Sequence, residues 1–262
     1  MASTLSKRDI DVLGKIKDPE ADPTMAPLLD DTLPKDPNVR GQDAYDRVCR
    51  EEREVVLAMQ QLEVGTTGLR PGSQSDPVLE YRKCIVVLDT LILANPSYAS
   101  ARNNRAQALR RLYGDAMLVG DAPAHGRGLV QAAGSEESTQ ASTTVLEDLD
   151  KAISLLSPPN LFAAMSPVAA KTLSLAHTQR AAVYHTTSKL LTTGPLQVDA
   201  VRKEASWTAI QFEEAASRDF ALGGRYGNDI AKGLAVSTNP TAKLCGQIVR
   251  EMMKKEYGPG LA

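Results

Sequence analysis

The sequence predicts an all-α fold built from repeated helical hairpins, and three observations lead to this fold class. Apolar residues recur three and four positions apart through most of the chain after residue 41, which is the spacing of one helix face. The apolar content comes mainly from Ala, Leu and Val, with only 4% aromatic residues, and small residues suit helices that cross closely. The alternation of Val, Ile, Tyr and Phe that is typical of strands is hard to find.

The chain divides into a tail and one helical domain. Residues 1–40 carry three Asp-Pro pairs and further prolines, which disfavour helix, so we expect a flexible N-terminal tail. A short helix is predicted at about 7–17 within this tail, because three apolar residues there lie three positions apart. The helical domain is expected over 41–257, followed by a C-terminal tail over 258–262.

Turn residues divide the domain into eight predicted helices. Ser166 is a suitable N-cap with Pro167 at the first helical position, and Asn95 with Pro96 ends an earlier helix. The stretch 116–142 is rich in Gly, Ala, Ser and Thr, so we expect an exposed insertion there. The predicted helices cover about 43–64, 77–94, 98–113, 143–156, 167–191, 199–218, 227–236 and 240–257.

Large and small residues recur in register in three of the hairpins. In the second helix of each hairpin, three packing positions are separated by four and then by three residues. They are Cys84, Leu88 and Leu91, then Val145, Leu149 and Ala152, and then Thr208, Phe212 and Ala215. In the first helix of each hairpin, a small residue stands where the helices cross, namely Ala58, Ala106 and Ala181.

These offsets are typical of the tetratricopeptide repeat, a helix–turn–helix unit of about 34 residues. The small positions are 48 and 75 residues apart, so the additional length must be loop. The segments rich in Gly, Pro and Ser lie in these gaps. We therefore predict three interrupted tetratricopeptide repeats followed by C-terminal capping helices. The alternative is a helical bundle without repeats.

Composition and charge restrict the partners and the compartment. The formal net charge is −2, so no basic excess draws the chain to nucleic acid or to an anionic membrane. The three cysteines, Cys49, Cys84 and Cys245, are far apart and odd in number, which is typical of reduced thiols. The longest apolar stretch is interrupted by Asp89 and is too short to span a bilayer. We expect a cytoplasmic protein, with the nucleus as an alternative.

The pattern of chemically reactive residues argues against catalysis. His125 falls in the predicted insertion, and His177 and His185 are eight residues apart on one predicted helix. A zinc site on a helix typically uses a spacing of four and further ligands. Neither a nucleophile elbow nor a phosphate-binding loop is present in the sequence. We expect no enzyme activity, no metal and no cofactor, and a cryptic enzyme is the remaining alternative.

A protein-binding groove is the functional site that the repeat predicts. The first helices of stacked repeats line the concave face, where Asn and Gln can bond a peptide backbone and Arg can pair with carboxylates. The candidate groove residues are Asn103, Asn104, Gln107, Arg110, Arg111, Thr178 and Gln179. An apolar patch at one end of the groove is predicted from Val55, Met59 and Leu62, with packing against the N-terminal helix as the alternative.

Three segments resemble the family of tetratricopeptide repeat protein 36. They are ASARNNRAQALRRLYGD, QFEEAA and the terminal NPTAKLCGQIVREMM, and the resemblance covers roughly residues 45–257. It implies three repeats with a helical cap, association with heat-shock chaperones of the seventy-kilodalton class, and control of tyrosine breakdown through a protein partner. Insertions at 66–76, 116–142 and 192–202 depart from the family pattern and predict a distant branch, for which we expect a fungal source.

One chaperone-binding mode of such repeats can be tested on the sequence. Repeats that clamp the acidic C-terminus of a chaperone carry Lys, Arg and Asn at five positions, occupied here by Val55, Met59, Asn104, Leu175 and Gln179. Only Asn104 matches the clamp. We therefore predict a non-catalytic adaptor, similar to a co-chaperone, that binds a chaperone or a metabolic enzyme without this clamp. The alternative is a structural subunit of a larger helical assembly that binds through its capping helices.

Overall fold

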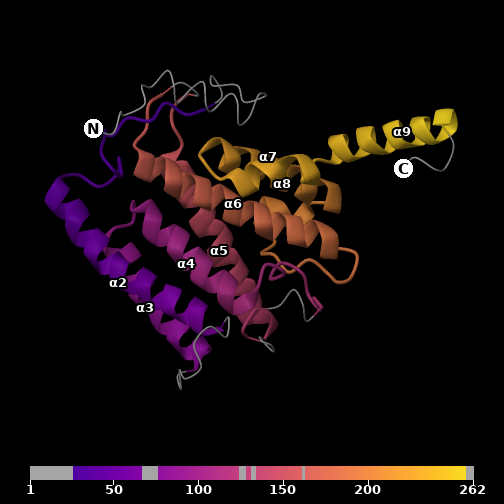
Figure 1. Cartoon of the computed structure of the whole chain (residues 1–262). Helices are drawn as coiled ribbons and strands as arrows, with labels where there is room; N and C mark the ends of the chain where they lie inside the picture. Colours follow the sequence, from indigo (N-terminus) through magenta and orange to yellow (C-terminus); the bar gives the residue numbers. More distant parts are fainter. Residues whose placement is uncertain (1–25, 67–75, 124–127, 131–133, 161–162, 258–262) are drawn as a thin grey trace.

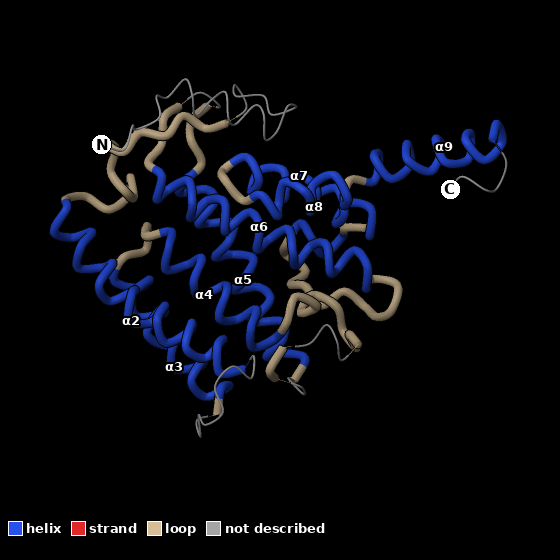
Figure 2. Tube along the Cα trace, in the orientation of Figure 1, coloured by secondary structure: helices blue, strands red, loops and turns tan. Residues whose placement is uncertain are grey.

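The computed structural model describes residues 26–66, 76–123, 128–130, 134–160 and 163–257, and the predicted helix at 7–17 lies outside them. The described part is helical and contains no strand, so the predicted all-α class is confirmed (Figure 2). The helices are α2 (Gln42–Thr66), α3 (Pro77–Ala94), α4 (Ala99–Tyr113), α5 (Ser135–Leu156), α6 (Pro167–Leu190), the 3₁₀ helix η3 (Lys203–Ser206), α7 (Ala209–Arg225), α8 (Asp229–Thr238) and α9 (Pro240–Tyr257).

The helices pack in the order of the chain. Each of α2 to α8 contacts the next α-helix, and α4 also contacts α2 and α6 (Figure 1). This order is what stacked helical hairpins require, with α2, α4 and α6 as first helices. The tetratricopeptide arrangement itself stays a prediction. Among the described residues, no helix has the length and apolar character that crossing a bilayer requires.

Local sequence explains where the helices begin. Asp76 caps α3 by accepting from the backbone N–H of Val78, and Ser166 caps α6 by accepting from that of Ala169. In both helices Pro follows the cap, where its missing N–H costs nothing. Thr208 begins α7 with a reciprocal capping box to Gln211.

The core divides into two clusters that share α4. One cluster joins α2, α3 and one face of α4, and the other joins the second face of α4 with α5 to α8. Most residues that recur at the predicted offsets are buried, namely Cys84, Leu88, Leu91, Val145, Leu149, Ala152, Phe212 and Ala215. Two positions differ, because Ala58 is only half-buried and Thr208 is an exposed helix cap.

The predicted exposed insertion over 116–142 is wrong in two respects. Its last residues belong to α5, which begins at Ser135 instead of near 143. Its first residues, Ala116 to Val119, are buried, because Leu118 and Gly120 exchange backbone hydrogen bonds with the segment 195–197. Local sequence could not reveal this pairing, since the two segments are far apart in the chain.

Two further boundaries differ from the prediction. Part of the predicted flexible tail is tied to the domain, because Leu28 and Asp30 share backbone hydrogen bonds with Met165. The predicted helix 199–218 is instead η3 followed by α7, since Thr208 caps a new helix that continues to Arg225.

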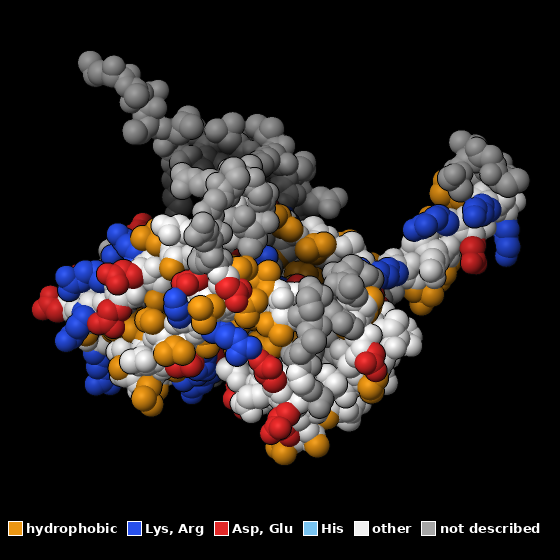
Figure 3. Space-filling model, turned by 90° about the horizontal axis from the view of Figure 1, so that it is seen from below, with side chains coloured by type: hydrophobic (Ala, Val, Ile, Leu, Met, Phe, Trp, Pro, Cys, Tyr) orange, Lys and Arg blue, Asp and Glu red, His pale blue; other side chains and the backbone are white. Residues whose placement is uncertain are grey.

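The helix α9 projects from the body (Figure 1). It contacts α7 and α8, and Lys243 pairs with Glu213 at its base. Its apolar side chains Leu244, Ile248 and Met252 are exposed, while Lys and Arg side chains stand on the same helix (Figure 3). The helix is therefore amphipathic and uncovered among the described residues.

Candidate functional site

Two of the predicted groove residues are buried and bonded to each other. Asn103 of α4 and Gln179 of α6 are almost inaccessible to solvent. The Gln179 Nε2 donates to the side-chain Oδ1 of Asn103 at 2.8 Å and to its backbone oxygen at 3.2 Å. These amides therefore join two first helices, and they are not exposed for a partner.

Three other predicted residues of α4 link that helix to α2. The Asn104 side chain donates to Glu52 Oε1 at 2.7 Å. Gln107 donates to Glu63 Oε1 at 3.3 Å, and Arg111 Nε donates to the same oxygen at 3.0 Å. The Arg111 side chain is 56% exposed, which leaves most of its guanidinium available to a partner. Arg111 is thus the most accessible of these three side chains.

The remaining groove residues have partners nearby. Arg110 donates to Asp115 at 2.7 Å and to Gln179 at 3.1 Å. The Thr178 hydroxyl accepts from Asn228 at 3.2 Å and so connects α6 to the start of α8. The sequence placed these residues on the right helices, but their mutual bonds could not be predicted from it.

The predicted apolar patch is wrong. Val55 is 5% and Met59 is 3% exposed, and both lie in the core that joins α2, α3 and α4. Leu62 is half-buried against the same core. Val55 and Met59 hold α2 on its neighbours, because both are buried in the core that the three helices share.

A cavity of about 130 Å³, not predicted from the sequence, lies where the beginnings of α4 and α6 meet the first half of α2. It is partly enclosed, and residues 35 and 36 of the N-terminal segment form part of its wall. Its lining is Lys35, Asp36, Tyr45, Cys49, Glu52, Tyr98, Ser100, Leu156, Val168, Ala169 and Thr172. Three first helices and the N-terminal segment therefore meet at one hollow.

Glu52 is a buried carboxylate in the wall of this cavity. The Tyr98 hydroxyl donates to its Oε2 at 2.5 Å, and Asn104 donates to its Oε1. Burial raises the pKa of Glu52, although hydrogen bonds from Tyr98, Ser100 and Asn104 act in the opposite direction. A signal for Glu52 exists in the sequence, because it interrupts the apolar stripe of α2 three positions before Val55.

Asp36 is the second buried acid of the cavity. It accepts from the backbone N–H of Asn38 at 2.8 Å, and the backbone of Ala99 also bonds it. Burial raises the pKa of Asp36 in spite of these bonds. The negative charge of Asp36 in turn contributes to the raised pKa of Glu52. No described Lys or Arg forms an ion pair with either carboxylate.

Buried acids elsewhere in the described chain do have cationic partners. Asp148 lies between Arg102 and Arg105, at 3.1 and 2.6 Å. Asp219 is held by Arg180 Nε at 2.7 Å and by His177 Nδ1 at 2.8 Å. His177 therefore serves a buried polar network, and no cluster of His, Cys, Asp and Glu suited to a metal ion occurs in the described part.

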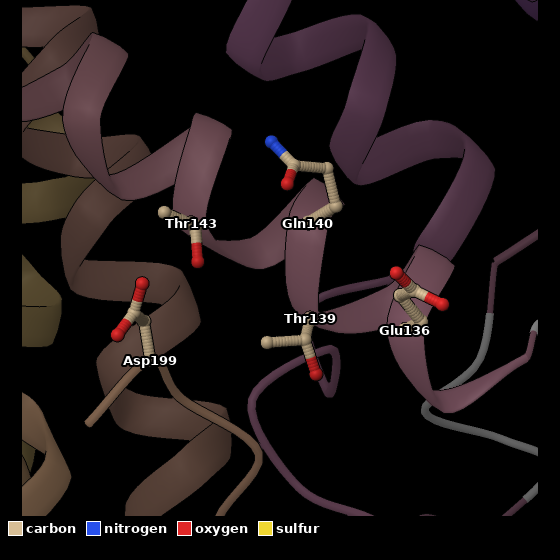
Figure 4. Close-up of a pocket in the computed structure, with 5 residues that line it drawn as sticks. All are labelled: Glu136, Thr139, Gln140, Thr143 and Asp199. Atoms are coloured by element: carbon tan, nitrogen blue, oxygen red, sulfur yellow. The ribbon is translucent and has the colours of Figure 1, made fainter.

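A second depression of about 290 Å³ lies on the surface beside α5 (Figure 4). Four of its residues come from one face of that helix, and Asp199 comes from the loop opposite. The Thr143 and Asp199 side chains point toward each other across it, while Glu136 lies at the far side (Figure 4). The depression is open and its residues are exposed or half-exposed, so it encloses a ligand less well than the cavity at Glu52.

A fungal relative resembles the chain over nearly its whole length. The L-tyrosine degradation gene cluster protein hmgX of Aspergillus fumigatus is 34% identical over 257 residues, which cover 97% of this chain and 93% of the relative. No protein-family model matches the chain, and no solved structure does. The repeat assignment and the resemblance to tetratricopeptide repeat protein 36 therefore stay predictions. At this identity and coverage, the chain belongs to the family of the L-tyrosine degradation gene cluster protein hmgX.

Proposed function

We propose that this protein is a non-catalytic adaptor that acts in tyrosine degradation by holding a protein partner. The observation that carries the proposal is the 34% identity with a relative named for a tyrosine degradation gene cluster. The resemblance to tetratricopeptide repeat protein 36 leads independently to the same process. The consecutive packing of hairpin helices supports a binding role, because such arrays present an extended surface to partners.

The polar surface of α4 is the proposed binding face. Arg111 and Gln107 share one carboxylate oxygen of Glu63, and Arg111 is more than half exposed. A carboxylate of a partner can replace Glu63 as the ion-pair partner of Arg111, because exposed ion pairs are worth little and exchange easily. The proposed partner therefore presents an acidic or amide-rich segment to this face.

A metabolic enzyme is a better partner in this proposal than a chaperone tail. The carboxylate clamp needs a cation where Val55 and Gln179 stand and an amide where Met59 stands, and all three positions are buried here. Asn104, which matches the clamp, already donates to Glu52. Association with a heat-shock chaperone through another face remains compatible with these contacts.

The proposal is tested by recovering tyrosine-degrading enzymes on the tagged protein from the native host grown with tyrosine as its nitrogen source. We expect at least one such enzyme to be enriched about tenfold over an unrelated tagged protein. The double variant Gln107→Ala, Arg111→Ala should lose this enrichment and slow tyrosine consumption.

Arg82→Ala is the matched control for this experiment. Arg82 is an exposed arginine of α3 that pairs with Glu137, so the variant removes a comparable charge from another face. It should retain the enzyme. If no tyrosine-degrading enzyme is enriched, the adaptor proposal is refuted. If an enzyme is enriched but both variants retain it equally, α4 is not the binding face.

The projecting helix favours a second candidate function, that of a subunit in a larger helical assembly. Leu244, Ile248 and Met252 lie on one face of α9 and are exposed. Such a face is typical of helices that enter a groove on another protein. The double variant Leu244→Asp, Ile248→Asp should dissociate the assembly in size-exclusion chromatography of cell extract and leave enzyme recovery through α4 unchanged.

A further inference from the structure

We propose that the cavity at Glu52 is a binding site for a primary alkylammonium group, carried either by a free amine or by a lysine side chain of a bound protein. The inference goes beyond the adaptor function, because it concerns a ligand that this chain can bind alone. It rests on three independent features of the cavity, which are its charge, uncompensated by any described Lys or Arg, its aromatic rings and its shape.

The negative charge of the two buried acids favours binding of a cation. Glu52 and Asp36 are both buried, and among the described residues the donors that bond them are neutral. In the same chain, Asp148 and Asp219 are as deeply buried, and each has an arginine. Burying a carboxylate without a counter-ion costs desolvation free energy. A cation that enters the cavity lowers this cost, and its binding is therefore favourable.

The aromatic rings of the cavity fit an ammonium group. Tyr45 and Tyr98 meet edge to face, with ring centroids 6.5 Å apart. The face of a phenol ring attracts a cation within about 6 Å, and Lys35 already uses this attraction, with its Nζ 5.6 Å from the Tyr45 centroid. The Lys35 ammonium forms no ion pair with either buried acid and is exposed, so it marks the mouth of the cavity.

The shape and the remaining walls fit a short alkyl stem. A volume of about 130 Å³ holds about four waters at ~30 Å³ each, which is close to the size of a four-carbon amine. Leu156, Val168 and Ala169 contribute apolar wall from the end of α5 and the start of α6. The acids come from α2 and the N-terminal segment, so the cavity offers a charged side and an apolar side.

Cys49 supplies a native reporter for occupancy. It lines the cavity, it is half-buried, and its sulfur lies 3.5 Å from the Tyr98 hydroxyl. Cys245 is exposed on α9 and Cys84 is buried in the core, so these two thiols are internal controls for reactivity. Iodoacetamide labelling of the full chain, followed by mass spectrometry, measures all three thiols in one sample.

The test adds n-butylammonium chloride to the full-length protein and uses 1-butanol with equal sodium chloride as the neutral control. We expect the amine to slow labelling of Cys49 at least fivefold and to leave Cys245 unchanged, while 1-butanol has no effect. Calorimetric titration should give saturable binding that Glu52→Gln weakens at least tenfold. Glu54→Gln, an exposed glutamate on the same helix, should bind as the wild type does.

Three outcomes overturn the proposal. One is that n-butylammonium protects Cys49 no better than 1-butanol does. Another is that Glu54→Gln weakens binding as much as Glu52→Gln, which would mean a general charge effect. The third is that the amine binds only to Lys35→Met, because Lys35 would then be the resident cation.

The source of the ammonium group is resolved by a peptide. Acetyl-Gly-Gly-Lys-Gly-Gly-amide is compared with the same peptide carrying acetyllysine. Tighter binding of the lysine peptide than of butylammonium assigns the site to a partner's side chain, and binding of butylammonium alone assigns it to a free amine. Neither result depends on the enzyme recovery that tests the adaptor function.

Discussion

The two halves of the molecule bury carboxylates in opposite ways. In the half built from α5, α6 and α7, Asp219 is fixed by Arg180 and His177. In the half built from α2, α3 and α4, Glu52 is fixed by a phenol, an amide and a hydroxyl. Both carboxylates receive the hydrogen bonds they need, but only the partners of Asp219 carry a positive charge that neutralises the carboxylate.

The ion-pair network around Asp219 has a structural role, whereas the acids at the cavity are available to a ligand. The Arg180 guanidinium bonds Asp219 and also Asp150, and Arg202 continues the network to Glu204. Such a network is complete within the chain and leaves little for a ligand. The acids Glu52 and Asp36 instead border a cavity and have no cationic partner in the described part of the chain, so a counter-ion can come from outside.

Removing Arg180 should have the largest effect of the changes considered. Arg180→Ala leaves Asp219 buried with His177 alone, and breaking a buried ion pair by deleting one partner costs about 3 to 5 kcal/mol. We expect the free energy of unfolding, measured by urea denaturation, to fall by about 3 kcal/mol. Arg218→Ala, an exposed arginine of α7, should change it by less than about 0.5 kcal/mol.

A double variant shows whether charge is the reason. Arg180→Ala, Asp219→Asn removes the buried anion together with its partner and should recover part of the lost stability. The alternative is that the double variant loses as much stability as the two single variants added together. The guanidinium then acts by packing, and the contrast between the two halves is weaker.

Glu52→Gln should have a smaller effect of the opposite sign. The Gln oxygen can accept from Asn104, while its amide donates to the Tyr98 hydroxyl, which can rotate to accept. We expect the free energy of unfolding at neutral pH to equal that of the wild type or to exceed it by about 1 kcal/mol. A loss of about 3 kcal/mol would mean that the Glu52 charge is compensated after all.

The pH dependence of this difference has a definite sign. Burial raises the pKa of Glu52 above its ordinary value of 4.5, so the folded state holds the proton more tightly than the unfolded state. Wild-type stability therefore falls as pH rises from 4.5 through the folded pKa, and Glu52→Gln lacks this fall. In urea denaturation between pH 4 and pH 8, the difference in the free energy of unfolding between the two proteins should widen as the pH rises.

Asp219 should give the reverse behaviour. Burial opposes ionisation, but the hydrogen bonds and charge of Arg180 and His177 lower the pKa of Asp219 below its ordinary value of 3.8. Its contribution is therefore present above that value and is lost as pH falls toward the folded pKa. The contributions of Glu52 and Asp219 to stability thus depend on pH in opposite directions.

Most of the fold could be predicted, because its signals are local. Asp76 before Pro77 and Ser166 before Pro167 give both the cap and the first turn of a helix, and the structure uses both. The burial of Ala116 to Val119 could not be predicted, since it depends on backbone pairing with the segment 195–197. Small residues without periodicity look like an exposed loop until that partner segment is known.

The candidate site was predictable only as far as the helices that carry it. Asn103 and Gln179 look like polar groove residues in the sequence, but they are 76 residues apart and satisfy each other. The stripe of Val55 and Met59 looks like a patch because the covering helices are not visible in the sequence. Glu52 carried a usable signal, since a charge on an apolar stripe must find a buried partner.

Arg111→Ala should have the smallest effect on stability. The Arg111 guanidinium bonds Glu63, but its side chain is 56% exposed, and water replaces that bond at little cost. We expect the free energy of unfolding to change by less than about 0.5 kcal/mol in urea denaturation. A partner that pairs with Arg111 should nevertheless bind more weakly to this variant, because association changes while folding does not. A loss above about 2 kcal/mol would mean that Arg111 supports the α2–α4 contact, and the proposed binding face would then have to be sought on another residue of α4.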